Sequence, residues 1–217
     1  MKLRLQPIRV YCLHHVTKEF DAKMMHDGDW MQIDVFIQRV TAMQQDGIEL
    51  ISLTDAYQHL STNWFRRKKY AVLTFDDGWM SLNEILPWLS EQQIPVTLFL
   101  NPAYLHGQDT REIGRCLKER ELNELIKSSN GTIQIASHGW NHALCTEMSI
   151  QEFKEGVDKS DSYLKQYASY VPFFAYPCGR HTVEQDRYLQ SKGIVPVYID
   201  GKGNYNEITV IHRENLE

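Results

Sequence analysis

The sequence predicts an α/β fold, a distorted (β/α) barrel of seven or eight parallel strands. Short apolar runs rich in β-branched and aromatic residues alternate with segments of helical periodicity, which is typical of βα units. The glycine-rich phosphate turns G-x-G-x-x-G and G-x-x-x-x-G-K-[ST] are absent from the sequence, which favours a closed barrel over the alternative, an open doubly wound sheet. With 217 residues, 42% of them hydrophobic and 24% charged, the chain suits a single domain spanning residues 1–217.

The predicted strands are apolar runs that end at polar or turn-forming residues. In chain order they are residues 8–13, 49–53, 70–75, 95–100, 132–136, 171–176, 195–199 and 208–212. A polar stretch follows the first strand, to residue 32. It has no regular period, and we expect it to fold over a site as a loop.

The helices are predicted from their apolar stripes and from cap residues. A first helix repeats apolar residues from 33 to 43 and stops at Gly47, which favours a helix end. Thr54 is predicted to cap a short helix that runs to Leu60. Ser81 and Glu84 have the spacing of a capping box, which predicts a helix start there.

The later helices follow the same rules. A charged segment, residues 111–127, has helical character. Ser149 and Glu152 form a second capping-box pattern, and Thr182 is predicted to open a last helix that ends near Gly193.

Composition excludes several classes of protein. A net charge of -5 does not suggest a nucleic-acid partner, and the basic run 66–69 is expected to be a solvated loop. No segment approaches the roughly 20 apolar residues of a membrane span, and the start lacks the apolar region of a secretory signal. The widely spaced cysteines predict free thiols in a reducing compartment, so a cytoplasmic location is expected; a fragment of an exported protein is the alternative. Oligomeric state has no signal in the sequence.

Polar residues that follow the predicted strands form a candidate catalytic site. Asp76 and Asp77 end one strand, and His138 and His142 follow another. In parallel barrels such positions meet at one rim. Two imidazoles four residues apart are expected to share one side of a helical turn, and a carboxylate would complete a His₂-Asp metal site with open positions. One acid of the pair would bind the metal, and the other would act as a general base.

Four motifs resemble the polysaccharide deacetylases of carbohydrate esterase family 4. TFDDG at residues 74–78 resembles the first motif of that family, and SHGWNH at 137–142 its second. FAYPCG at 174–179 is similar to the third motif of the poly-N-acetylglucosamine deacetylase branch, and VYCLHHV at 10–16 to the start of that branch. The resemblance covers roughly residues 8–198, and the motifs have the order of the family.

The resemblance implies a role for each matching residue. Asp76 would be the base that takes a proton from the attacking water. Asp77, His138 and His142 would be the ligands of a divalent metal, usually Zn²⁺. The backbone N–H of Cys178 would help to hold the oxyanion.

Two histidines compete for the role of the acid that protonates the leaving amine. His14 is implied by resemblance to the branch with an early histidine, and we prefer it. His212 is the alternative, because Val210-Ile211-His212 resembles a late motif that supplies the acid elsewhere in the family. His15 should point to the opposite side of its strand from His14 and is expected to pack or to lie on the surface.

The sequence also departs from the family pattern. Gly139 replaces the usual Ser or Thr of the second motif, which removes a hydroxyl that helps to order the loop. The third motif lacks the Arg that orients the base in many members; Arg180 is close in sequence. Trp79 and Trp140 are predicted either to stack on a sugar ring or to pack in the core.

The expected function is that of a metal-dependent hydrolase that removes N-acetyl groups from amino sugars in a poly- or oligosaccharide. One alternative is the same fold cleaving another C–N bond, in a cyclic amide or a lipid-linked sugar. A second alternative is a non-catalytic carbohydrate-binding barrel, although no acid or ligand of the motifs has been lost.

Overall fold

The structure is a computed structural model, and it describes residues 6–18, 30–62, 68–108, 115–205 and 208–216. Its strands are β1 (Arg9–Leu13), β2 (His15–Thr17), β3 (Trp30–Gln32), β4 (Ile48–Leu50), β5 (Lys69–Asp76), β6 (Val96–Leu100), β7 (Ile133–Ser137), β8 (Tyr170–Ala175), β9 (Val195–Ile199) and β10 (Ile211–Asn215). The α-helices are α1 (Ile33–Gln45), α2 (Leu53–Thr62), α3 (Leu86–Glu91), α4 (Pro102–Leu105), α5 (Glu119–Ser128), α6 (Ile150–Leu164) and α7 (Val183–Ser191). Short 3₁₀ helices are η2 (Met80–Glu84), η3 (Cys145–Glu147) and η4 (Pro177–Gly179).

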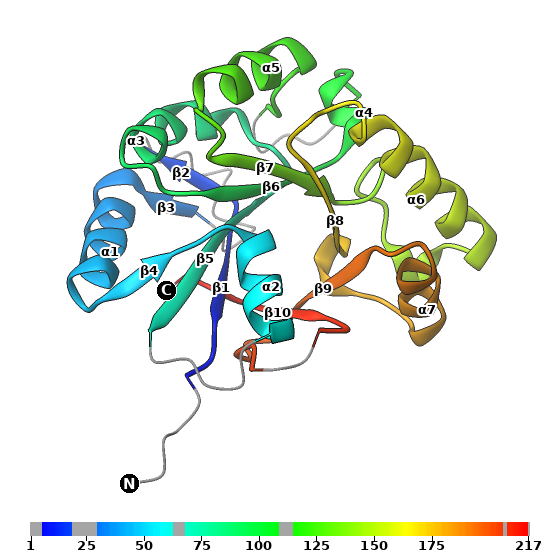
Figure 1. Cartoon of the computed structure of the whole chain (residues 1–217). Helices are drawn as coiled ribbons and strands as arrows, with labels where there is room; N and C mark the ends of the chain where they lie inside the picture. Colours follow the sequence, from blue (N-terminus) through cyan, green and yellow to red (C-terminus); the bar gives the residue numbers. More distant parts are fainter. Residues whose placement is uncertain (1–5, 19–29, 63–67, 109–114, 206–207, 217) are drawn as a thin grey trace, which may run out of the picture.

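Seven parallel strands close into a barrel. The sheet runs β1-β10-β9-β8-β7-β6-β5, and β1 also pairs with β5, which closes the ring. β4 extends the sheet by pairing with the start of β5. The predicted (β/α) barrel of seven or eight parallel strands is therefore confirmed. Figure 1 shows α1, α3, α5, α6 and α7 arranged around the outside of the barrel.

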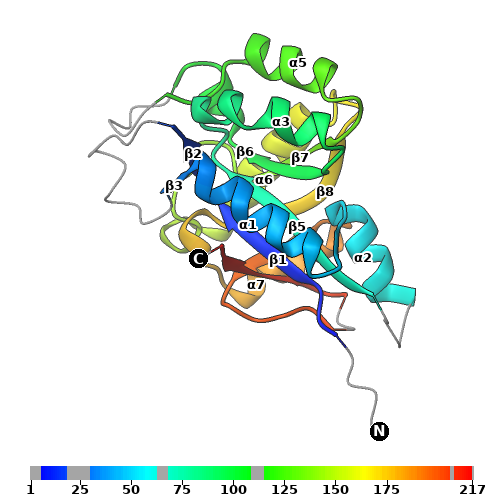
Figure 2. The ribbon, with the colours of Figure 1, turned by 90° about the vertical axis from the view of Figure 1, so that its left-hand side faces the viewer.

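The barrel interior is filled by alternate side chains of each strand, as the two-residue period of a strand requires. Val10, Val72, Phe99 and Val197 belong to one buried cluster that also includes residues of α2. Because α2 packs into this cluster, it closes the end of the barrel at which the strands begin. Figure 2 shows α2 at the opposite end of the barrel from β2 and β3.

Several predicted elements have the expected ends. Ser149 caps α6, and its hydroxyl accepts the N–H of Glu152 at 3.3 Å while the Glu152 carboxylate accepts the N–H of Ser149 at 2.8 Å. Thr182 caps α7 in the same way, through Gln185. The prediction of these two helix starts is confirmed.

The predicted capping box at Ser81 is wrong. Residues 80–84 form the 3₁₀ helix η2, and α3 begins only at Leu86. The Glu84 carboxylate instead accepts the Thr17 hydroxyl at 2.8 Å and the Lys18 N–H at 3.1 Å. The Glu84 carboxylate therefore binds residues on and beside β2, which are distant in sequence, and does not cap a helix as the sequence pattern predicts.

Three further boundaries differ from prediction. Ser52 caps α2 in place of Thr54, because its hydroxyl accepts the N–H of Asp55 at 3.1 Å. In the charged segment 111–127 the helix begins only at Glu119; residues 109–114 lie outside the described residues, and Cys116 forms an antiparallel bridge with Trp79. The last strand lies three residues later than predicted, since Ile211 pairs with Val197 of β9.

The stretch predicted as a loop over the site is only partly described. Residues 19–29 lie outside the described residues. On either side of them, β2 and β3 form a small parallel pair in which His15 is opposite Trp30.

Candidate active site

The two adjacent carboxylates lie in different surroundings. Asp76 is the last residue of β5 and faces the barrel interior, where it is 3% exposed. Asp77 follows with a φ of 69°, so the chain turns and its carboxylate points to another group of residues. Gly78, with a φ of 70°, completes the turn, and a Cβ there would lie 2.6 Å from Leu100 Cδ2. The turn thus separates the partners of the two acids.

Asp76 is held by a bidentate ion pair with Arg213 of β10. Arg213 Nη1 donates to Asp76 Oδ1 at 2.6 Å, and Nη2 donates to Oδ2 at 2.8 Å. Nη1 also donates to the hydroxyl of Thr74 at 3.1 Å, and the guanidinium lies 5.0 Å from the centre of the Phe99 ring. Two parallel bonds fix the plane of the carboxylate as well as its position.

The charge state of Asp76 follows from these contacts. Burial on its own raises the pKa of this carboxyl, but the charges of Arg213 and His138 and the bonds from Arg213 outweigh burial. The net result is a pKa well below the usual range for Asp. Asp76 is therefore an ionised carboxylate in a buried position, which is the form that accepts a proton.

Asp77 shares a cluster with two imidazoles. Asp77 Oδ1 lies 3.4 Å from His142 Nε2 and 3.7 Å from His138 Nε2, and one ligand atom from each residue lies within 4.8 Å of the other two. Asp77 and His138 are buried, and His142 is partly exposed. Of the three side chains, His142 is therefore the one that meets solvent.

The donor set fits a divalent metal ion. Tetrahedral Zn²⁺ with nitrogen and oxygen ligands has neighbouring donor atoms about 3.4 Å apart, given bonds of about 2.0–2.2 Å. The two Asp77–His distances of 3.4 and 3.7 Å are close to this value. His138 Nδ1 donates to the carbonyl of Ala175 at 2.8 Å, so in the neutral imidazole, the form that binds a metal, Nε2 carries the lone pair that faces the cluster. Three ligands of this kind leave coordination positions for water or substrate.

The two histidines converge through an irregular loop, and the predicted helical turn is absent. Residues 138–142 are not helical, and Gly139 and His142 have φ values of 78° and 58°. The Asn101 side chain donates to the carbonyl of His138, and the Ser137 hydroxyl accepts the N–H of Gly139 at 3.2 Å. Asn101 and Ser137 thus order the loop in which Gly139 supplies no hydroxyl.

His14 and His212 occupy different faces of the barrel wall. His14 follows β1, and one ring nitrogen lies within 4.8 Å of a carboxylate oxygen of Asp76 and of the Cys12 sulfur. His212 precedes the inward-facing Arg213, so it points outward, where Nδ1 lies 2.9 Å from Oδ2 of Asp200. Of these two histidines, the structure places His14 beside the buried carboxylate.

The neighbouring aromatic residues mainly pack. Trp79 is 1% exposed and packs against His15, with ring centroids 4.4 Å apart and ring planes tilted by 31°. Trp140 is half-buried, and the ammonium group of Lys159 lies 3.7 Å from the centre of its ring. The alternative of core packing therefore applies to Trp79.

The third motif lies next to the His cluster. Cys178, in η4, has a φ of 53°, and the N–H of Gly179 donates to the carbonyl of Tyr176 at 2.8 Å. η4 follows β8, whose last residue Ala175 accepts the bond from His138. Arg180 is exposed, and the cation that binds Asp76 is Arg213.

Comparison with known families gives one match. The family model described as polysaccharide deacetylase matches residues 65–197, a segment that contains Asp76, Asp77, His138 and His142. The chain belongs to the polysaccharide deacetylase family. The family consists of hydrolases that act on the N-acetyl groups of polysaccharides, and its members generally depend on a divalent metal.

Solved structures share the fold of this deacetylase. The Streptococcus pyogenes deacetylase PplD, in complex with acetate, has a TM-score of 0.84 and 19% identity over 98% of this chain and 93% of PplD. IcaB from Ammonifex degensii has a TM-score of 0.80 and 20% identity over 98% and 92%. A de-N-acetylase from Aggregatibacter actinomycetemcomitans has a TM-score of 0.76 and 17% identity over 96% and 94%. In motifs and fold this deacetylase resembles the poly-N-acetylglucosamine deacetylase branch. No protein of curated function matches the sequence.

Arg213 is the residue of the deacetylase site that sequence reasoning misses. Its strand is predicted to end at residue 212, because His212-Arg213-Glu214-Asn215 has no apolar residue. Only the pairing of β10 with β9 and β1 brings the guanidinium into the interior. One signal in the sequence could have indicated such a residue. The third motif lacks the Arg that orients the base in many members, so another part of the chain must supply the cation.

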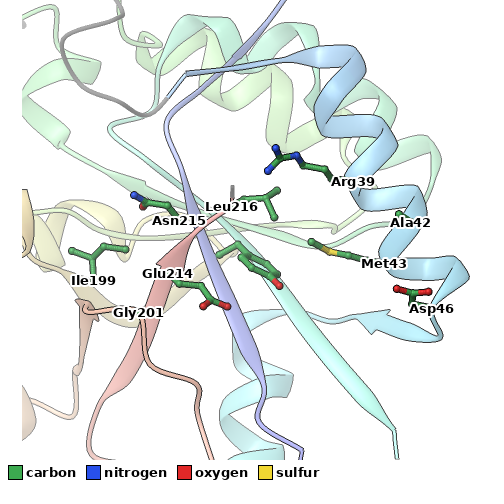
Figure 3. Close-up of a pocket in the computed structure, with 10 residues that line it drawn as sticks. Arg39, Ala42, Met43, Asp46, Ile199, Gly201, Glu214, Asn215 and Leu216 are labelled. Atoms are coloured by element: carbon green, nitrogen blue, oxygen red, sulfur yellow. The ribbon is translucent and has the colours of Figure 1, made fainter.

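The deacetylase also has a cavity of about 680 Å³ outside the barrel, between α1 and the strands β1 and β10. Figure 3 shows Arg39 and Met43 extending from α1 on one side of the cavity, with Glu214 and Asn215 of β10 on the other side. None of the site residues lines it. Among the described helices, none is long and apolar enough to cross a membrane.

Proposed function

We propose that this chain is a zinc-dependent deacetylase that removes N-acetyl groups from N-acetylglucosamine units of a poly- or oligosaccharide, with residues 1–217 acting as a single catalytic domain. The observation that supports this proposal is the division of the acid pair. Asp77 lies beside the imidazoles of His138 and His142, whereas Asp76 lies beside Arg213 and His14. Deacetylation needs both a ligand set and a separate base.

A divalent ion held by Asp77, His138 and His142 would supply Lewis acidity toward the acetyl carbonyl and would lower the pKa of water. The chain's own residues supply the proton transfers. Asp76 takes a proton from the attacking water, and Arg213 holds both of its oxygens in place during this step.

The remaining steps break the amide bond. The oxygen of water adds to the carbonyl carbon, and the backbone N–H of Cys178 donates to the oxygen that gains negative charge. The C–N bond then breaks as protonated His14 gives its proton to the leaving nitrogen. The products are acetate and a free amino sugar.

Metal analysis and acetate release from a series of N-acetylglucosamine oligomers test the proposal together. Asp76→Asn should retain metal and lose at least about 10²-fold in kcat, because general-base catalysis typically supplies that much. Asp77→Asn should lose both metal and activity. Full activity in a metal-free sample, or unchanged metal content in Asp77→Asn, contradicts the proposal.

The same assay separates the competing functions. Ring opening of a cyclic amide without acetate release would indicate another C–N hydrolase, and oligosaccharide binding without turnover would indicate a binding protein. His14→Gln and His212→Gln form a matched pair for the acid. His14→Gln should lose about 10²-fold in kcat, and His212→Gln should keep most of it; the reverse order would assign the acid to His212.

A further inference from the structure

A second group of metal-binding side chains lies beside the first. One ligand atom each from Cys12, His14 and Asp76 lies within 4.8 Å of the other two. Cys12 is on β1 opposite Thr74 of β5, so its side chain enters the interior just below Asp76. The Cys12 thiol donates to Asp76 Oδ2, with the sulfur 3.6 Å from that oxygen. The cluster therefore combines a thiol, an imidazole and a carboxylate at the end of the barrel that holds the site.

We propose that Cys12, His14 and Asp76 form a second, weaker site for a thiophilic divalent cation such as Zn²⁺, and that excess metal inhibits the enzyme by filling it. The inhibitory consequence rests on the proposed function, because Asp76 and His14 are its base and its acid. Tetrahedral zinc, with Zn–S of about 2.3 Å and Zn–O of about 2.1 Å, separates sulfur and oxygen by about 3.6 Å. The Cys12 Sγ to Asp76 Oδ2 distance is 3.6 Å.

The two clusters should fill in a fixed order. The guanidinium of Arg213 already donates to both carboxylate oxygens of Asp76. Each carboxylate oxygen accepts at two positions, so a metal can still bind, but it must approach a positive charge. Asp76 Oδ2 is also only 3.9 Å from His138 Nε2, a ligand atom of the first cluster. A cation at Asp77, His138 and His142 would repel a second one, so the Cys12 site should fill only with excess metal.

Binding at the Cys12 site balances as a proton exchange. The S–H bond of Cys12 breaks and, where His14 is protonated, so does the N–H bond that faces the cluster; bonds from the metal to sulfur and nitrogen form, and the protons leave to the buffer. No electrons are transferred. The metal would take the lone pair with which Asp76 accepts a proton, and it would occupy the nitrogen on which His14 must carry one, so the occupied enzyme cannot move protons at either residue.

Cobalt(II) distinguishes the two clusters, because only a cobalt–thiolate bond gives a ligand-to-metal charge-transfer band in the near ultraviolet. We expect the first equivalent of Co²⁺ to bind the reduced protein without this band and the second equivalent to produce it. Cys12→Ser should abolish the band, keep the first equivalent, and raise the concentration for half-occupancy of the second site at least about tenfold. Cys145→Ser, a buried thiol outside both clusters, and Cys178→Ser, an exposed thiol, should keep the band.

Inhibition provides the second measurement. Excess Zn²⁺ should inhibit the wild type, and Cys12→Ser should resist, with each protein compared with its own activity at one equivalent of metal. A thiolate band that persists in Cys12→Ser, or a wild type that binds a single equivalent in excess Co²⁺, overturns the second site. If the band behaves as expected but no acetate is released from any oligomer, the site stands and the proposed function fails. If acetate is released but no thiolate band appears, the proposed function stands and the second site fails.

Discussion

Three residues of the site have backbone conformations that side chains rarely adopt. Asp77, His142 and Cys178 have φ values of 69°, 58° and 53°. A left-handed conformation costs about 1–2 kcal/mol for a residue with a Cβ. For His142, the bonds that Asn101 and Ser137 make to residues 138 and 139 hold the loop that bears this cost. The positions of the carboxylate and the imidazoles are therefore set by the surrounding packing.

Arg213 is the residue whose replacement should change the behaviour of Asp76. Arg213→Gln removes the cation that lowers the pKa of Asp76 and leaves burial, which raises it. The acid limb of the kcat/KM profile should therefore move to higher pH. Loss of a buried partner should also lower the free energy of unfolding by about 3–5 kcal/mol. Arg213→Lys, which keeps the charge, should leave the acid limb closer to that of the wild type.

Arg180→Gln is the matched control for Arg213, since Arg180 is exposed. Its pH–rate profile should equal that of the wild type. If the acid limb moves in Arg180→Gln and stays in Arg213→Gln, the positioning role of Arg213 is wrong.

Gly78 is required by both conformation and space. Gly78→Ala would place a Cβ 2.6 Å from Leu100 Cδ2 at a φ of 70°. We expect a loss of about 2–4 kcal/mol in the free energy of unfolding, from backbone strain plus overpacking. Gly47→Ala, with a φ of 74° and no atom within 4 Å, should lose only about 1–2 kcal/mol. Urea unfolding measures both; equal losses would show that the contact with Leu100 is unimportant.

At the scale of elements, Asn204 joins the first strand region to the last strand. Its side chain donates to the carbonyls of Ile8 and His212 at 3.2 and 2.8 Å, and it accepts the N–H of His212 at 2.8 Å. Asn204 is 2% exposed. These bonds help to place β10, and with it Arg213, beside β1.

Asn204→Ala should therefore weaken both the barrel and the site. Buried main-chain groups that lose a partner cost about 1–3 kcal/mol each, so we expect a loss of at least about 2 kcal/mol in the free energy of unfolding. Activity of the folded protein should fall as well, because Arg213 adjoins His212. Asn123→Ala, an exposed change on α5, should alter neither quantity. An active, fully stable Asn204→Ala would show that β10 is placed by other contacts.

Element starts show how far sequence patterns extend. Ser81-x-x-Glu84 and Ser149-x-x-Glu152 are the same pattern, but only the second caps a helix. The Glu152 carboxylate binds within its own turn, and the Glu84 carboxylate binds Thr17 and Lys18. A local rule holds where no residue distant in sequence competes for the same group.

At the scale of the whole molecule, a metal would connect two parts of the barrel. Asp77 follows β5, and His138 and His142 follow β7, so one ion links strands that have β6 between them. A ligand that binds only the folded state stabilises it by about 2.7 kcal/mol at 100 times its dissociation constant. The free energy of unfolding should therefore depend on zinc.

Removing zinc with a chelator should lower the Tm by about 5–10 °C relative to protein with a hundredfold excess over the dissociation constant, given about 2–4 °C per kcal/mol for a chain of this size. Differential scanning calorimetry measures the change. Asp77→Asn should show little dependence of the Tm on zinc. A Tm that is independent of zinc in the wild type would contradict metal binding at this cluster.

The sequence by itself predicted the parallel barrel and placed Asp76, Asp77, His138 and His142 at the ends of its strands, because strand periodicity and parallel connectivity depend on local pattern. His14 was implied by the resemblance to a family branch. The sequence did not predict the loop of left-handed residues that turns His138 and His142 toward Asp77. The partner of Asp76 was also decided by tertiary structure. Arg213 is 137 residues away in the chain, and the register of β10 against β9 and β1 brings it into the barrel. A register between distant strands depends on the packing of the closed sheet, which no local segment contains.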